Sequence, residues 1–219
     1  MMAMRFGFTT RRAPLSKVNN KIYYCLHLTK ILGAGLANPY ELVQIHFHWG
    51  SGKGFGSEHT INGKAGEAEV HFVHWNKAKY ATVAEAMDNQ DGLAVLGAIM
   101  VENTSRANFS TQRMIKHFPY LRKPNFKYPC TGTIYLNEML PNLTKFYTYD
   151  GSLTTPPLNE CVKWIVLGKP IYVSKNEMQI LRSLEHIHGP NFINNFRPLQ
   201  PKNGRVVENN FELRPDQLD

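Results

Sequence analysis

The stretch Gln44-Ile45-His46-Phe47-His48-Trp49-Gly50 decides how this chain folds, because it joins β-forming residues with two histidines two positions apart. Side chains alternate across a strand, so both imidazoles are expected on one face. A second run, Glu69-Val70-His71-Phe72-Val73-His74-Trp75, offers a third imidazole in a similar context. Three neutral imidazoles on rigid strands, with one coordination position left open, make a catalytic zinc site. The two runs therefore predict a sheet that carries a metal centre.

The rest of the sequence predicts a mixed, mainly β fold in a single domain with short surface helices. Runs rich in Val, Ile, Phe and Trp predict strands at residues 40–49, 68–75, 93–101, 162–167 and 171–173. Helices are expected at residues 82–89, 110–118 with Ser110 as the cap, and 174–185 with a capping box of Ser174 and Glu177. Turns are expected at residues 50–56, 62–63 and 150–151.

The charge of the chain is high, but its location argues against a nucleic-acid partner. The net charge is +8 over 219 residues, and the first 40 residues hold six Lys and Arg with no Asp or Glu. Removing those six leaves +2 for the remainder, which has no basic stripe interleaved with aromatic residues. No segment approaches the ~18 apolar residues that a membrane span requires, so no transmembrane segment is expected. Three cysteines without paired spacing do not predict a disulfide framework.

The basic N-terminal segment has more than one interpretation. An acid-free, Arg-containing start is typical of a mitochondrial transit peptide, and a solvated basic extension has the same composition. No apolar run follows Met1 closely, which disfavours a secretory signal. A cytoplasmic protein is the first expectation, with a mitochondrial or a secreted one as alternatives. The sequence leaves the oligomeric state open.

Each histidine strand also carries a polar residue two positions before a histidine. Gln44 precedes His46 and Glu69 precedes His71 on the same strand face. Metal-bound imidazoles usually donate their second N–H to such a group, which fixes the tautomer. The alternative is that the histidines are hydrogen-bonded core residues, which is the commoner case for a single histidine. By spacing alone, His59 and Glu58 remain possible ligands, while His74 points to the opposite face and is expected to pack structurally.

The segment Gly151-Ser152-Leu153-Thr154-Thr155-Pro156-Pro157 supplies hydroxyl groups on a loop stiffened by two prolines. A zinc-bound hydroxide needs an acceptor for its own proton, so that a lone pair faces the substrate. A Thr hydroxyl serves if a buried carboxylate takes the Thr proton in turn, and Glu58 is the candidate carboxylate. An ordinary Pro-rich turn explains the loop equally well.

Taken together, these motifs resemble those of the α-class carbonic anhydrases. They follow the family order at residues 44–50, 56–60 (Gly-Ser-Glu-His-Thr), 69–75, 91–97, 151–157, 160–167 and 197–201 (Arg-Pro-Leu-Gln-Pro). The resemblance runs from about residue 33 to about residue 207. It implies a large central twisted, mostly antiparallel sheet with short surface helices.

The resemblance also implies roles for individual residues. His46, His48 and His71 match the Zn²⁺ ligands, and Gln44, Glu69 and the Asn195 carbonyl match their hydrogen-bond partners. Thr154 matches the residue that accepts a hydrogen bond from the zinc hydroxide, and Glu58 matches the acceptor behind it. The substrate wall would comprise Thr154, Thr155, Val73, Val95, Leu153, Val162 and Trp164. The implied activity is the reversible hydration of carbon dioxide to bicarbonate and a proton, with sulfonamides as inhibitors.

The sequence departs from the family at its start. We expect residues 1–32 to be a basic, non-matching segment and residues 33–219 to be the catalytic domain, incomplete at its N-terminal end. Counting back from Gln44 places the proton-shuttle position near Ser16, where no histidine stands, and His27 is out of register. Proton transfer would then rely on buffer. The alternative function is a non-catalytic binding or scaffold domain, although such relatives typically lose a zinc histidine and this chain keeps three.

Overall fold

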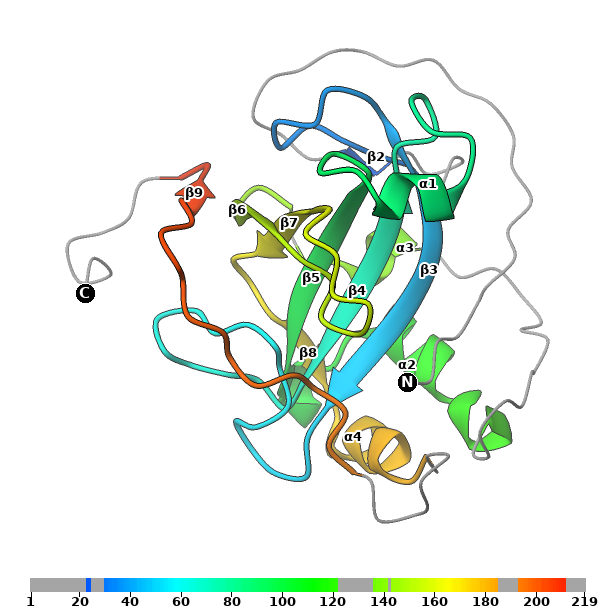
Figure 1. The fold of residues 1–219 in the computed structure, drawn as a ribbon. Coiled ribbons are helices and arrows are strands. Elements are labelled where there is room, and N and C mark those ends of the chain that lie inside the picture. The colour runs from blue at the N-terminus through cyan, green and yellow to red at the C-terminus, as the bar shows by residue number, and fades with distance from the viewer. Residues whose placement is uncertain (1–22, 25–29, 122–135, 142, 185–192, 212–219) are drawn as a thin grey trace.

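The computed structural model describes residues 23–24, 30–121, 136–141, 143–184 and 193–211. Nine strands form one curled sheet in the order β1-β2-β3-β4-β5-β7-β6-β9, with β8 paired to β5 beside that path (Figure 1). The strands are β1 (Tyr23–Tyr24), β2 (Lys30–Leu32), β3 (Tyr40–Trp49), β4 (Ala68–Trp75), β5 (Leu93–Glu102), β6 (Phe146–Gly151), β7 (Val162–Leu167), β8 (Ile171–Val173) and β9 (Glu208–Asn209). The expected mixed, mainly β fold is confirmed.

The centre of the sheet is formed by β3, β4 and β5, which are long, antiparallel and rich in β-branched and aromatic residues. Strand β5 then pairs in parallel with both β7 and β8, and β7 pairs antiparallel with β6. The register sets His46 opposite His71 and His48 opposite Glu69. Because directly opposed residues share a face of the sheet, this pairing brings all four side chains to one side.

The two faces of the central strands are packed differently. One face builds the large apolar core, with Ile45, Phe47, Phe72, Leu96 and Met100 all buried. On the other face, a smaller apolar cluster forms around Val73, Val95, Val162, Trp164 and Val166. The histidines and Glu69 lie on this second face, beside the smaller cluster.

The helices are short, and two of them begin at the expected residues. Thr82 caps α1 (Val83–Met87), and Ser174 with Glu177 forms the predicted capping box of α4 (Lys175–Arg182). The remaining helical elements are η1 (Thr104–Arg106), α2 (Phe109–Ile115), η2 (Phe118–Leu121) and α3 (Leu136–Met139). The sequence predicted Ser110 as the cap of α2, and this was wrong: Asn108 caps the helix, since its side chain accepts from the Thr111 N–H. None of the helices in the described ranges is long and apolar enough to cross a membrane.

One turn prediction was wrong and another is confirmed. Asp150 and Gly151 end strand β6 rather than forming a turn, because they pair with Lys163 and Val162 of β7. Asn62 and Gly63 do turn the chain, both with positive φ, between the bridged residues Ile61 and Lys64. Ser16 and His27, which bear on the expected absence of a proton shuttle, lie outside the described residues.

Candidate metal centre

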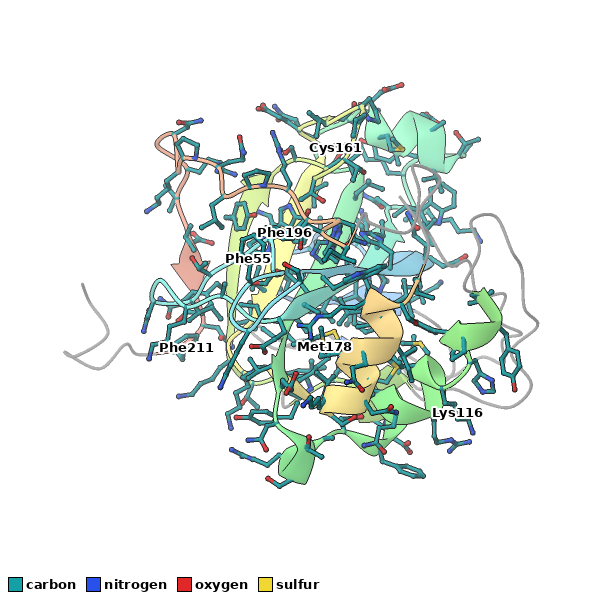
Figure 2. All side chains as sticks on the ribbon, turned by 90° about the horizontal axis from the view of Figure 1, so that it is seen from below. Phe55, Lys116, Cys161, Met178, Phe196 and Phe211 are labelled. Atoms are coloured by element: carbon teal, nitrogen blue, oxygen red, sulfur yellow. The ribbon has the colours of Figure 1, made fainter. Side chains whose placement is uncertain are left out.

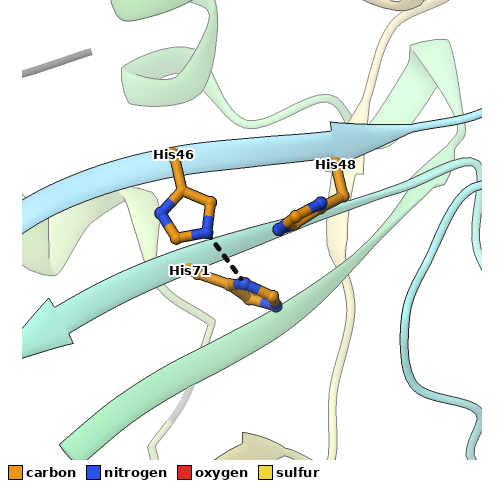
Figure 3. A group of neighbouring side chains, drawn as sticks. All are labelled: His46, His48 and His71. Atoms are coloured by element: carbon orange, nitrogen blue, oxygen red, sulfur yellow. Dashed lines mark hydrogen bonds between the residues drawn. The ribbon is translucent and has the colours of Figure 1, made fainter. Parts of the chain in front are cut away.

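Three histidines converge on the polar face of the central sheet. His46 and His48 project from β3 and His71 from β4, and their rings face one another (Figure 3). One nitrogen of each ring lies within 4.8 Å of the others, and all three side chains are buried. His46 Nε2 and His71 Nδ1 are 3.2 Å apart. The strand alternation inferred from the sequence therefore brings the three imidazoles together.

The protonation state of these histidines suits a metal. Burial is the main reason that the pKa values of His46, His48 and His71 lie below their ordinary value, and that of His46 lies well below. The neutral imidazole is the form that coordinates a metal ion. Among the described residues, the buried Nε2 of His48 has no hydrogen-bond partner, although buried polar atoms normally have one. A cation between the rings would satisfy this atom, so the three residues fit a zinc ion.

Two of the three histidines are held by hydrogen bonds on their far side. His48 Nδ1 lies 2.9 Å from the Asn195 carbonyl oxygen, and His71 Nε2 lies 2.8 Å from Glu69 Oε1. Both hydrogen bonds link pairs that were expected from the sequence. The third expected pair does not form a hydrogen bond: Gln44 Oε1 and His46 Nδ1 are both buried without a partner among the described residues.

Glu69 is the centre of a wider network. Its carboxylate accepts from the backbone N–H groups of Glu58 and His59 and lies 2.6 Å from His59 Nδ1. The other nitrogen of His59 is 2.7 Å from the Tyr149 hydroxyl. Burial alone would raise the pKa of Glu69, but the charge of His59 and the hydrogen bonds of both histidines hold it well below its ordinary value. Glu69 is thus an ionised acceptor that fixes the orientation of His71.

A glycine makes room for this network. Gly97 of β5 lies opposite His71, and a Cβ atom there would come 3.1 Å from Glu69 Oε1 and 3.4 Å from the Trp164 ring. The contact with Glu69 is tight enough that its carboxylate would have to shift by a few tenths of an ångström. Gly97 therefore lets Glu69 and Trp164 pack close to His71, whose ring centroid is 4.8 Å from that of Trp164.

Glu58 and Thr154 meet beside the histidines. Glu58 is buried, and its Oε1 lies 3.3 Å from His48 Nδ1 and accepts from the Arg197 N–H at 2.7 Å. Burial raises the pKa of Glu58, while hydrogen bonds from Arg197 and from the Thr154 side chain oppose that rise. Thr154 and Thr155 are half-buried in the loop that links β6 to β7.

The residues expected to form an apolar wall share one cluster. Val73, Val95, Val162 and Trp164 are buried together, and Leu153 packs against them half-buried. The Trp164 indole N–H donates to the Ser152 carbonyl oxygen at 3.0 Å, which ties the wall to the loop that carries Thr154.

Sequence reasoning left His59 as a possible ligand and missed Tyr149. His59 Nδ1 faces Glu69, and the group of His59, Glu69 and His71 forms a second set of close donor atoms that shares His71 with the first. Nothing in the sequence pointed to Tyr149. It lies in β6, and this strand was not predicted because the Asp150-Gly151 pair has the composition of a turn. His74 is buried on the opposite face, as expected, with Nδ1 3.3 Å from the Ala94 carbonyl oxygen.

Comparison with known proteins gives a consistent picture. The family model of eukaryotic-type carbonic anhydrases matches residues 5–211. Carbonic anhydrase 7 of Mus musculus is 40% identical over 191 residues, which cover 84% of this chain and 70% of the relative. The Homo sapiens protein of the same name is 41% identical over 190 residues, with the same coverage. Mitochondrial carbonic anhydrase 5A of Rattus norvegicus is 39% identical over 84% of this chain and 60% of its own length.

Proposed function

Because the chain belongs to the eukaryotic-type carbonic anhydrase family, we propose that it is a zinc enzyme that reversibly hydrates carbon dioxide to bicarbonate and a proton. One observation carries this proposal beyond family membership. Three neutral, buried imidazoles present nitrogens within 4.8 Å of one another, and one of these nitrogens lacks any partner in the described part of the chain. A relative that had lost its chemistry would have little reason to keep such a costly arrangement.

His46, His48 and His71 would hold the zinc ion through three nitrogens. Zinc supplies a nucleophile at neutral pH by lowering the pKa of a bound water to about 7. The Asn195 carbonyl and the Glu69 carboxylate keep His48 and His71 in the tautomers and orientations that coordination requires. Gln44 lies on the same face, and we propose that its amide takes this role for His46 by a change of rotamer.

Glu58 and Thr154 would set the direction of attack. Glu58 would accept the hydrogen bond of the Thr154 side chain, so that the Thr154 oxygen is left to accept rather than donate. The attacking group would then donate a hydrogen bond to Thr154 and present a lone pair to the substrate. The Thr154 amide and Thr155 would orient the substrate oxygens, as preorganised donors do in acyl-transfer sites.

The apolar cluster beside the histidines suits carbon dioxide, which has no net dipole. Val73, Val95 and Val162 are each at most 6% exposed, and Trp164 closes the wall. Leu153 completes it from the Thr154 loop. Bicarbonate is charged and fits such a wall poorly, so the same surface favours release of the product.

The proposal is tested by measuring zinc content and carbon dioxide hydration of the purified full-length chain, with and without a small imidazole buffer. We expect one zinc per chain, inhibition by a sulfonamide, and activity that rises with buffer because no shuttle histidine is expected near residue 16. His46→Ala should lose both zinc and activity. A folded chain without zinc or activity would contradict the proposal and favour the non-catalytic binding module.

A further inference from the structure

Besides the metal centre, the molecule has a second cavity, which lies beside the Thr154 loop. It encloses about 220 Å³ and is lined by Glu58 and Thr154 but by none of the three histidines. Its outer wall is the segment that runs from near α4 to β9, orange to red in Figure 1. Asn195 and Phe196 fasten the start of this segment: the Asn195 side chain bonds to β3, and Phe196 packs edge-on against Phe55 at 4.7 Å between centroids (Figure 2). The start of this wall is therefore held against β3 and Phe55.

The lining of this cavity is cationic. Arg197, Lys202 and Arg205 contribute to it, whereas Glu58 is the one Asp or Glu among the described residues that line it. Glu58 is buried, and its Oε1 already accepts a hydrogen bond from the Arg197 N–H. In the described ranges, none of the three cations forms an ion pair with a carboxylate. A charge excess in a partly enclosed space attracts anions.

Arg205 is held ready for such a ligand. Its Nε and Nη2 donate to the carbonyl oxygens of Lys202 and Pro201, at 3.0 and 2.8 Å. Its guanidinium lies over the Tyr149 ring, 5.3 Å from the centroid. These contacts fix the side chain and leave Nη1 without a partner among the described residues. A cation that is already immobilised loses little entropy when it binds a carboxylate.

One part of the remaining wall is flat and apolar. Tyr149 and Trp164 are stacked, with an interplanar angle of 12°, and both contribute to the lining together with Val207. The space is smaller than the 300–1,000 Å³ typical of drug-sized ligands. We propose that this cavity is a second binding site for a small organic carboxylate, whose anionic group meets Arg205 and Lys202 and whose apolar part lies along the aromatic walls. This inference does not depend on the proposed activity.

Benzoate is a suitable probe, because it joins a carboxylate to a flat apolar ring. The full-length protein is titrated with benzoate by calorimetry and by tryptophan fluorescence, since Trp164 lines the cavity. We expect saturable binding of one benzoate per chain below about 10 mM. Arg205→Gln and Lys202→Gln should each weaken it about tenfold, as expected for loss of a charge-assisted contact. Lys116→Gln is the matched control, since Lys116 is exposed at the C-terminal end of α2 and distant from Phe196 (Figure 2).

The other outcomes overturn the inference. Equal weakening by Lys202→Gln and Lys116→Gln would reduce the effect to overall charge. If benzoate affinity were unchanged in both cavity variants but lost in His46→Ala, the benzoate would be binding at the metal centre. Inorganic phosphate binding in place of benzoate would exclude an organic carboxylate, and no saturable binding at all would exclude the site. Since Lys202 is exposed, Lys202→Gln remains informative even if Arg205→Gln fails to fold.

Discussion

The two faces of β3 and β4 are built from alternate residues of the same strands, yet they are packed for different purposes. On one face, the side chains of Ile45, Phe47 and Phe72 are wholly apolar and pack into the large core. On the other, His46, His48 and His71 are also buried, but His46 and His48 each leave a ring nitrogen without a partner among the described residues. One face therefore contributes mainly apolar packing, while the other holds the proposed metal ligands at a cost in desolvation. The neighbours Phe72 and His71 allow this contrast to be tested directly.

The largest effect is expected from His71→Ala. Removing one of the three proposed zinc ligands should abolish stoichiometric zinc and reduce carbon dioxide hydration by ~10³-fold or more, since the metal would supply the nucleophile. The free energy of unfolding of the zinc-free protein should change much less than in Phe72→Ala. Zinc analysis and stopped-flow assays measure the first effect. Full zinc occupancy in this variant would contradict the ligand assignment.

Phe72→Ala should have the opposite profile. Phe72 is 0% exposed in the large core, and deletion of a buried Phe side chain typically costs about 3–5 kcal/mol. We expect a large loss in the free energy of unfolding in urea, while the molecules that remain folded still bind one zinc each. If this variant lost zinc while remaining folded, the two faces would not be separable.

Thr154→Val tests the polar face without removing a ligand. The variant keeps the shape of the side chain but cannot accept a hydrogen bond or donate one to Glu58. We expect full zinc content and a fall in turnover equivalent to ~2–3 kcal/mol, the scale of losing one preorganised group. Steady-state kinetics and metal analysis on the same sample provide the check. Unchanged turnover would rule out the proposed role of Thr154.

The dependence of folding stability on pH offers a further test of the two faces, through His74. It lies on the core face, and burial lowers its pKa to about 3, although hydrogen bonds to backbone carbonyls partly oppose this. The unfolded chain takes up a proton near pH 6.5, whereas the folded chain does so only near pH 3. Folding stability from this residue is therefore present above pH 6.5 and is lost as the pH falls, by about 1.4 kcal/mol per pH unit.

The measurement compares zinc-free wild type with zinc-free His74→Gln between pH 6.5 and 4. The wild-type free energy of unfolding should fall more steeply with decreasing pH, by the equivalent of one proton. Parallel curves for the two proteins would show that His74 does not remain neutral in the core.

Much of this architecture was predictable from local pattern, because β3 and β4 are dense in β-formers and alternate cleanly. The bounds of both strands and the facing of the three histidines follow from that pattern alone. Strand β6 was not predictable, since Asp150-Gly151 has the composition of a turn and is made into strand by its pairing with β7. Asn108 replaced Ser110 as a cap for a similar reason: its amide also bonds to the Glu138 carbonyl, a contact distant in sequence.

The candidate site shows the same limit. The alternation of side chains along a strand correctly placed Gln44 on the same face as His46. Whether the two side chains form a hydrogen bond depends on the Gln44 rotamer, which sequence periodicity does not specify. The roles of Tyr149 and of the cations that line the second cavity could not be predicted, because these residues are brought together from segments that lie far apart in the sequence. The boundary expected at residue 33 stays a prediction.

The bond between His48 and Asn195 spans 147 residues of chain. Asn195 also receives the Trp49 N–H on its side chain and donates to the Phe47 carbonyl, so three successive residues of β3 depend on a segment near the C-terminal end. On a ribosome, β3 and β4 would emerge early, and all three imidazoles would be available long before Asn195 is synthesised. The nascent chain can then gather its ligands but not fix them. Tight metal capture would thus wait until the segment that contains Asn195 has been synthesised.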